Sequence, residues 1–213
     1  MSFVERVAEP RMGEGTPPLL VLLHGIGADE NDLFPVGRML DPRLKVVSLR
    51  APEPYYGGWS WFHIDFLPGG RVVPDVAQAR AALDRLVDWI AAAPARHGTD
   101  PARTFLLGFS QGAMMALGAL GTVPERLAGV IALSGRYPGE LFAAPASREA
   151  IARVPVLLAH GVYDDVLPVA HGRASREALA PLVPDLTYRE FPVAHGISDE
   201  EIEVARDWLR ARR

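Results

Sequence analysis

Cysteine is absent from the 213 residues of this chain. Without thiols a protein can hold no disulfide framework and no thiolate-bound metal, and it cannot use a cysteine nucleophile. An excess of positive charge is also missing, because 22 basic residues face 26 acidic ones, for a formal net charge of −4. That balance argues against a protein that binds nucleic acid by neutralising phosphates, so we expect no nucleic-acid partner.

Long hydrophobic runs are missing too. No segment approaches the roughly 20 consecutive apolar residues that a membrane-spanning helix needs. The first ten residues contain Glu5, Arg6 and Glu9, which do not fit the apolar centre of a secretory leader. We therefore expect a cytoplasmic protein with no integral membrane association.

What the chain does contain is the composition of an ordinary globular protein. Hydrophobic residues make up 49% and charged residues 23% of the sequence, which is typical of a soluble fold. A length of 213 residues is close to the usual size of one domain. We expect residues 1–213 to form a single domain.

Short apolar runs recur along the chain and alternate with amphipathic stretches. Continuous apolar runs of about four to six residues are typical of strands that are buried on both faces of a parallel sheet. A further strand near Phe3–Ala8 is expected to pair antiparallel at an edge. The other expected strands are Leu19–Leu23, Val46–Leu49, Thr104–Phe109, Val130–Leu133, Val154–Ala159 and Leu186–Phe191.

Helical patterns occupy the stretches between these strands. Apolar residues recur at spacings of three and four from Val76 to Ala93, with Pro74 and Asp75 at the start. Strands that alternate with helices of this length predict an α/β fold with a mostly parallel central sheet and helices on both faces. The other expected helices are Gln111–Leu120, Val169–Leu182 and Glu200–Leu209, the last capped by Ser198 or Asp199.

Two stretches fit neither pattern and are expected to be irregular loops. Gly135–Arg148 is rich in proline and alanine, and Ala51–Arg71 carries six aromatic residues among glycines and prolines. A packed surface loop is one interpretation of Ala51–Arg71. The other is a wall of an apolar substrate pocket, lined by Trp59, Trp61 and Phe62.

A Gly-x-Ser-x-Gly motif spans Gly108–Gly112 and centres on Ser110. The motif alone is weak evidence, but an expected strand runs into it and an expected helix begins directly after it. That context is typical of a nucleophile elbow, in which a tight turn exposes the serine hydroxyl at the N-terminus of a helix. The alternative is a plain strand–helix turn in which Ser110 caps the helix. We favour the elbow, with Ser110 as the nucleophile.

A serine hydroxyl needs a base to act as a nucleophile, and the base needs an acid to orient it. In a fold with this kind of elbow the chain order is serine, acid, histidine. Three histidines follow Ser110. His160 ends an expected strand and His171 lies in an expected helix. His195 follows the last expected strand in a loop, where sites of this kind assemble, and is the expected base.

The acid must then lie between Ser110 and His195. Asp164 and Asp165 directly follow an expected strand, which makes them the strongest candidates. Geometry cannot separate two neighbours in one loop. Asp185 and five glutamates also lie in this interval.

Two backbone N–H groups are needed to stabilise the oxyanion that forms when a serine attacks a carbonyl group. One is expected from Gln111, the residue after the nucleophile. The other is expected from Ile26, in the loop after the first long apolar run, where Gly25 and Gly27 allow the backbone to approach a ligand. We expect His24 to shape this loop rather than to take part in catalysis.

Four segments together resemble the phospholipase/carboxylesterase family of α/β-hydrolases, which includes acyl-protein thioesterases. The family's serine falls on Ser110 and its C-terminal histidine falls on His195. Its pattern HGxxDxxxP implies that Asp164, rather than Asp165, is the acid. The segments are Leu23–Asp32 (LHGIGADEND), Asp100–Gly112 (DPARTFLLGFSQG), His160–Pro168 (HGVYDDVLP) and Ala194–Glu201 (AHGISDEE).

The resemblance implies an α/β-hydrolase fold and hydrolysis of carboxylic esters or thioesters, with neither metal nor cofactor. A chain of about 210 residues leaves no room for a large cap domain, which favours esters of short- to medium-chain acids. Acyl-protein thioesterase or lysophospholipase activity is the alternative within the family. A non-catalytic binding protein on the same fold is the alternative of another class. The expected partner is a small-molecule ester, and a homodimer is compatible with the aromatic residues near the site.

Overall fold

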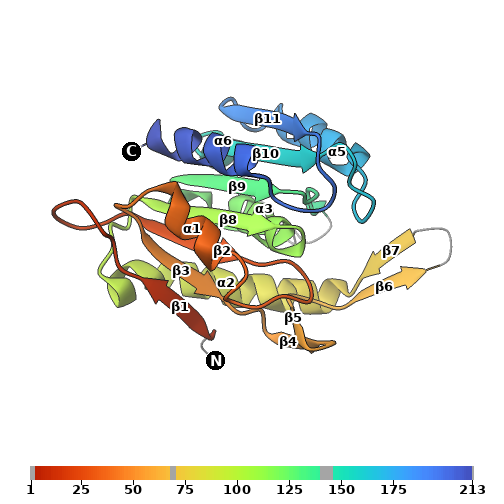
Figure 1. The fold of residues 1–213 in the computed structure, drawn as a ribbon, viewed down its shortest axis with the longest axis horizontal. Coiled ribbons are helices and arrows are strands. Elements are labelled where there is room, and N and C mark those ends of the chain that lie inside the picture. Colours follow the sequence, from red (N-terminus) through yellow and green to blue (C-terminus); the bar gives the residue numbers. More distant parts are fainter. Residues whose placement is uncertain (1–2, 68–70, 140–145, 213) are drawn as a thin grey trace.

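The computed structural model describes residues 3–67, 71–139 and 146–212. Its main feature is a seven-stranded sheet in the order β1-β3-β2-β8-β9-β10-β11 (Figure 1). β1 pairs antiparallel with β3 at one edge and all other neighbours are parallel, which confirms the predicted edge strand and the mostly parallel sheet. The strands are β1 (Glu5–Ala8), β2 (Leu19–Leu23), β3 (Lys45–Leu49), β8 (Thr104–Phe109), β9 (Gly129–Leu133), β10 (Val156–Gly161) and β11 (Leu186–Phe191).

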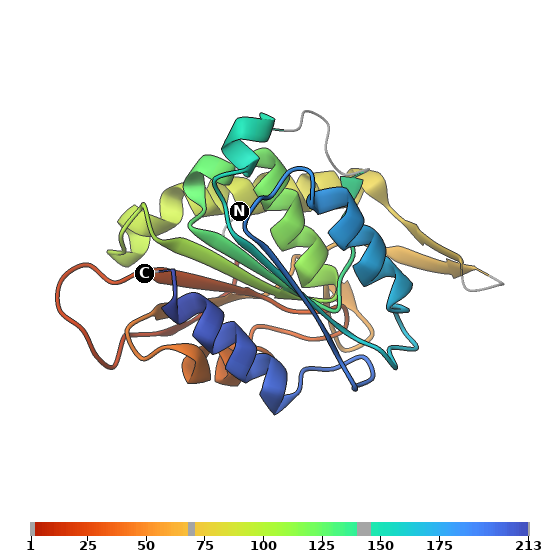
Figure 2. The same cartoon turned by 90° about the horizontal axis from the view of Figure 1, so that it is seen from above.

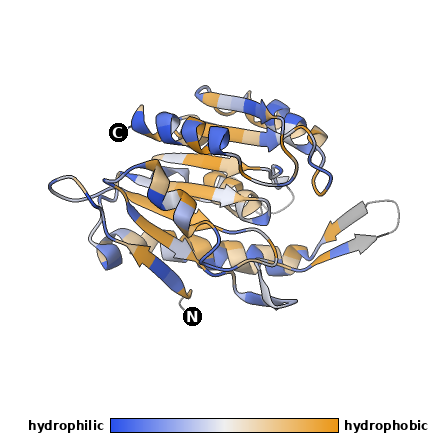
Figure 3. Ribbon diagram, viewed as in Figure 1, coloured by the Kyte–Doolittle hydropathy of each residue, from blue (hydrophilic) through white to orange (hydrophobic). Residues whose placement is uncertain are grey.

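Helices cover both faces of this sheet (Figure 2). Successive side chains of a strand point to opposite faces, so a strand that is apolar at every position needs a hydrophobic layer on each side. In β2, Val21 packs in one core and Leu22 in the other. Figure 3 shows the apolar residues gathered in the central strands. The helices are α2 (Val76–His97), α3 (Gln111–Thr122) and α5 (Ala170–Leu179) on one face, and α1 (Phe34–Leu40) and α6 (Asp199–Arg210) on the other.

All four predicted helices are present, with shifted ends. α2 ends where Gly98 adopts a positive φ of 63° and its N–H bonds to the Pro94 carbonyl group. α6 begins after Ser198, which forms a capping box with Glu201 and is therefore the N-cap. Two short helices, α1 and α4 (Arg148–Ile151), lie outside the predicted set, because so few residues show no clear periodicity. None of the helices in the described ranges has both the length and the hydropathy to cross a membrane.

The expectation of an irregular loop over Ala51–Arg71 is wrong. The described part of this stretch, which excludes residues 68–70, forms strands of two antiparallel hairpins. These strands have three or four residues each, too few for a period of two to stand out among glycines and prolines. In the other stretch expected to be irregular, residues 140–145 lie outside the described residues. The hairpins are β4 (Glu53–Tyr55) with β5 (Gly58–Ser60) and β6 (Ile64–Leu67) with β7 (Arg71–Pro74).

An ion pair joins α5 to the edge strand β11. The Nε and Nη2 atoms of Arg173 donate to the two carboxylate oxygens of Glu190, both at 2.8 Å. The hydroxyl of Tyr188 donates to the same carboxylate at 2.8 Å. The bonds from Arg173, reinforced by that from Tyr188, lower the pKa of Glu190 to about 2. The ion pair therefore stabilises the fold above about pH 4.3, the ordinary glutamate value, and its contribution is lost as the pH falls toward 2.

Replacing the carboxylate of Glu190 tests this pH dependence of the stability. Glu190→Gln is expected to lower the free energy of unfolding by about 1 kcal/mol at pH 7 and by less at pH 3. Urea unfolding followed by circular dichroism at both pH values measures the difference. Glu177→Gln is the control, because the exposed carboxylate of Glu177 lies 4.0 Å from the nearest arginine nitrogen, on Arg176. An equal loss in the free energy of unfolding at both pH values would contradict this pH dependence.

Candidate active site

Ser110 stands between β8 and α3 in a strained turn. Its φ of 54° and ψ of −115° are costly for a residue with a side chain. Its hydroxyl makes no capping hydrogen bond to α3, which argues against a plain capping turn. A Cβ atom at Gly112 would lie 1.9 Å from the carbonyl oxygen of Leu23, and one at Gly108 would lie 2.3 Å from the carbonyl oxygen of Gly112. Both glycines are therefore needed for the close approach of α3 to β2 and β8.

A series of hydrogen bonds connects three side chains at the carboxyl ends of the parallel strands. The hydroxyl Oγ of Ser110 lies 3.0 Å from Nε2 of His195, and Nδ1 of His195 lies 2.7 Å from Oδ2 of Asp164. These residues follow β8, β11 and β10 respectively. Because the strands are parallel, their carboxyl ends meet at the same edge, and the three loops come together there. Asp165, the neighbouring carboxylate, is exposed.

The loop after β10 holds the carboxylate of Asp164 in one orientation. This side chain is completely buried, and its Oδ1 accepts hydrogen bonds from the N–H groups of Val166 at 3.0 Å and Leu167 at 2.7 Å. Nε2 of His160, near the end of β10, donates to the carbonyl oxygen of Leu167 at 2.7 Å. Oδ2 is thereby directed toward His195, whose side chain is 15% exposed.

The loop after β2 is shaped by His24, which is completely buried. Its Nδ1 donates to the carbonyl oxygen of Gly25 at 2.7 Å, and its Nε2 accepts from the N–H group of Ala51 at 3.0 Å. Burial lowers the pKa of His24 and keeps the ring neutral, as these two bonds require. Within the described residues, the backbone N–H groups of Ile26 and Gln111 donate to no protein acceptor, so both are available to a ligand.

The three aromatic residues expected at a substrate pocket occupy different environments. Trp61 and Phe62 have no exposed surface and belong to the hydrophobic core. A substrate could reach neither side chain in this structure. Trp59 is partly buried, with the guanidinium of Arg50 5.0 Å from its ring centroid, and its backbone pairs with Ala28. This segment therefore packs against the loop after β2.

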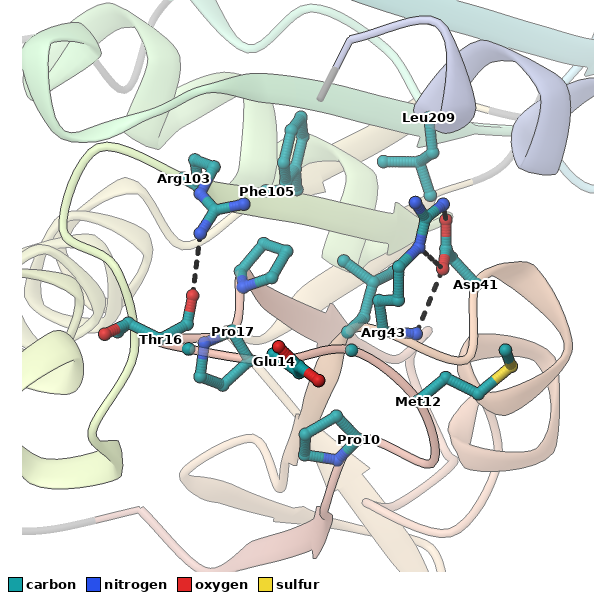
Figure 4. Close-up of a pocket in the computed structure, with 14 residues that line it drawn as sticks. Pro10, Met12, Glu14, Thr16, Pro17, Asp41, Arg43, Arg103, Phe105 and Leu209 are labelled. Atoms are coloured by element: carbon teal, nitrogen blue, oxygen red, sulfur yellow. Dashed lines mark hydrogen bonds and ion pairs between the residues drawn. The ribbon is translucent and has the colours of Figure 1, made fainter.

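A well-defined cavity lies at the opposite end of the sheet (Figure 4). Its volume is about 130 Å³, and its lining includes Pro18, Leu44 and Arg103, which precede β2, β3 and β8. Arg43 and Arg103 in its wall are each paired with an aspartate. Because this cavity is at the amino ends of the strands, it is separate from the site around Ser110. The described parts of the chain hold no group of three His, Asp or Glu side chains that could bind a metal.

Comparison with known proteins assigns the chain to a family. The sequence pattern described as phospholipase/carboxylesterase matches residues 5–212. The chain belongs to the phospholipase/carboxylesterase family. This membership confirms the resemblance of the four sequence segments and the α/β-hydrolase fold, and it makes the protein a member of a hydrolase family.

Individual members of the family are similar over most of their length. Esterase YpfH of Escherichia coli strain K12 is 30% identical over 200 residues, which cover 90% of this chain and 82% of that protein. Acyl-protein thioesterase 1 of Cryptococcus neoformans var. neoformans is 27% identical over 216 residues, which cover 89% of this chain and 90% of that protein. The crystal structure of esterase PE8 matches with a TM-score of 0.87 and 34% identity over 100% of both chains.

The close approach at the elbow can be tested with a single methyl group. Gly112→Ala is expected to destabilise the fold by about 3 kcal/mol or more, because the new Cβ must displace backbone. Gly118→Ala in the same helix is the matched control, since the atoms nearest its Cβ would belong to the Leu83 side chain, the first of them at 3.1 Å. Thermal and urea unfolding measure both variants. Equal stability of the two would contradict the packing described at Gly112.

Proposed function

We propose that the protein is a serine carboxylesterase that hydrolyses short- to medium-chain carboxylic esters through an acyl-enzyme. The observation that carries the proposal is the series of hydrogen bonds from Ser110 through His195 to Asp164, at 3.0 and 2.7 Å. At such distances the imidazole can take the hydroxyl proton while the carboxylate stabilises the resulting charge. Membership of a hydrolase family with relatives named esterase supports the same reaction.

In the first half of the proposed reaction, Oγ of Ser110 forms a bond to the acyl carbon of the ester. At the same time, Nε2 of His195 takes the proton of the Ser110 hydroxyl group. The oxyanion of the tetrahedral intermediate accepts hydrogen bonds from the N–H groups of Ile26 and Gln111. Collapse of the intermediate breaks the bond to the leaving oxygen, and His195 returns the proton to the alcohol. The N-terminus of α3 adds a favourable field for the negative charge.

In the second half, His195 takes a proton from a water molecule, and the oxygen of that water attacks the acyl carbon. The same two N–H groups bind the second oxyanion. The bond from the acyl carbon to Oγ breaks, and the proton returns to Ser110, which releases the carboxylic acid. Every step uses groups of this chain and water, so the proposed reaction requires no cofactor.

The proposed preference for short- to medium-chain esters is supported by the open surroundings of the site. Within the described residues, no separate cap domain lies over the carboxyl edge of the sheet. Ser110 is half-buried, and the side chain of His195 is 15% exposed. Because Trp61 and Phe62 are buried in the core, neither side chain can line a pocket for a long acyl chain.

Thioester hydrolysis is the second candidate, favoured by the similarity to a protein named acyl-protein thioesterase 1. The two activities are separated by comparing p-nitrophenyl esters of two to twelve carbons with an S-palmitoylated peptide. Highest kcat/KM on the esters of two to eight carbons supports the carboxylesterase. A value for the peptide at least tenfold above the best ester supports the thioesterase.

Replacing the proposed nucleophile tests the core of the mechanism. Ser110→Ala is expected to lower kcat/KM for p-nitrophenyl butyrate by at least about 10³-fold, because no acyl-enzyme can form. A fluorophosphonate should label Ser110 in the wild type and leave the variant unlabelled. Circular dichroism checks that the variant is folded. Full activity of Ser110→Ala would rule out this mechanism, and a wild type that neither reacts nor is labelled would favour a binding protein.

The acid has a matched control in its neighbour. Asp164→Asn is expected to lower kcat by about 10³- to 10⁴-fold, because an amide no longer stabilises the charged imidazole or its tautomer. Asp165→Asn changes an exposed carboxylate in the same loop and is expected to keep kcat within about twofold. Steady-state kinetics with p-nitrophenyl butyrate compares them. Similar losses in both variants would remove Asp164 from its proposed role.

A further inference from the structure

We propose that the side chain of Gln111 is a positioning residue that sets the spacing between the two oxyanion-binding N–H groups. This inference rests on the proposed function and concerns the side chain of Gln111, whereas the mechanism above uses only its backbone. The connection runs through Trp59–Phe62, a segment that begins in β5 of the first hairpin and ends before β6 of the second.

The first part of the connection is a pair of hydrogen bonds made by the amide of Gln111. Only 2% of this residue is exposed. Its Oε1 accepts from the N–H group of Trp61 at 2.7 Å, and its Nε2 donates to the carbonyl oxygen of Phe62 at 2.7 Å. Both partners are backbone groups, so the amide of Gln111 holds the backbone of Trp61 and Phe62 in place and does not merely fix a side-chain rotamer.

The second part joins the same segment to the loop after β2, on both sides of Ile26. Before Ile26, the indole Nε1 of Trp61 donates to the carbonyl oxygen of His24 at 2.9 Å. After Ile26, the N–H group of Gly27 donates to the carbonyl oxygen of Trp59 at 2.8 Å. The backbone that carries the Ile26 N–H group is thus held at both ends by the Trp59–Phe62 segment.

Taken together, these bonds link one proposed oxyanion donor to the other. The N–H group of Gln111 belongs to the same residue as the amide that begins the connection, and the N–H group of Ile26 lies between its two final bonds. An oxyanion is stabilised only when both donors lie about 2.7–3.1 Å from it. A displacement of about 1 Å in such a site can cost about 10²-fold in rate.

Glutamine suits this position because its amide combines an acceptor and a donor at one end of the side chain. The Trp61 N–H group requires the acceptor and the Phe62 carbonyl oxygen requires the donor. Methionine has a similar length and offers neither function. Asparagine keeps the amide but is one methylene shorter, so it cannot reach both partners from the first turn of α3.

The experiment compares Gln111→Met and Gln111→Asn with a matched control. The control is Gln78→Met, because Oε1 of Gln78 accepts from the N–H group of His63 at 2.8 Å, directly after the Trp59–Phe62 segment. This variant also removes a glutamine-to-backbone bond, but from α2 rather than from α3. Active sites are counted with a fluorophosphonate, and kcat and KM for p-nitrophenyl butyrate are expressed per titrated site.

A boronic acid provides a readout that a purely structural role would not change. It forms a tetrahedral adduct with a nucleophilic serine, and an oxygen of that adduct occupies the oxyanion position. Both Gln111 variants are expected to lower kcat by about 10- to 100-fold per titrated site with KM within about threefold, and to raise the inhibition constant of the boronic acid by a similar factor. Gln78→Met is expected to stay within about twofold in every quantity.

Two results would overturn the inference. One is a kcat per titrated site within threefold of the wild type in both Gln111 variants. The other is a loss confined to KM, which would indicate a role in substrate binding instead. Failure of the proposed function is a separate result, because it would appear in the wild type as absence of both ester hydrolysis and labelling.

A double variant tests whether the connection is a single path. Trp61→Phe removes the indole donor to His24 and keeps an aromatic ring in the core. Combined with Gln111→Met, it is expected to lower kcat little further than the more severe single variant, because the path is already broken. Losses that multiply would show two independent effects and would contradict a single path.

Discussion

The contact between the first turn of α3 and the end of β2 is the constraint on which the site depends. With 1.9 Å between the Leu23 carbonyl oxygen and the position of a Cβ at Gly112, no larger residue fits. This contact places the turn of Ser110 beside the loop after β2. The unfavourable backbone conformation of Ser110 persists because the sheet fixes it, in part through the bond from its N–H group to the Leu133 carbonyl oxygen of β9 at 2.9 Å.

Three buried polar side chains near this contact share one property, which is that each is bonded to the backbone. Asp164 accepts from two N–H groups, His24 bridges two backbone groups, and Gln111 does the same. Buried polar groups with all partners in place are rigid. Their orientation is therefore established when the protein folds, and a substrate does not have to supply the free energy of ordering them.

Most of the sheet was predictable because strands such as β2 and β9 are apolar at every position, a pattern with few alternatives in a chain of this length. The order of Ser110 and His195 in the chain, and their positions after predicted strands, were enough to place both at the carboxyl ends of the parallel strands. Choosing Asp164 over Asp165 needed the family pattern, because adjacent loop residues are equivalent in sequence. The bond between Gln111 and Trp61 was not predictable, since it joins residues 50 positions apart whose approach depends on the hairpin β4–β5.

The ion pair between Arg173 and Glu190 also bears on how this protein can associate. It lies on β11, which has no strand beyond it within the described residues, and such an edge can accept a strand from a second molecule. Arg189 places a further charge on the same strand. Charged side chains on an edge strand are one of the means by which proteins discourage the addition of a further strand. The charges on β11 therefore act against extension of the sheet across this edge, which is one route by which proteins with an unpaired edge strand aggregate.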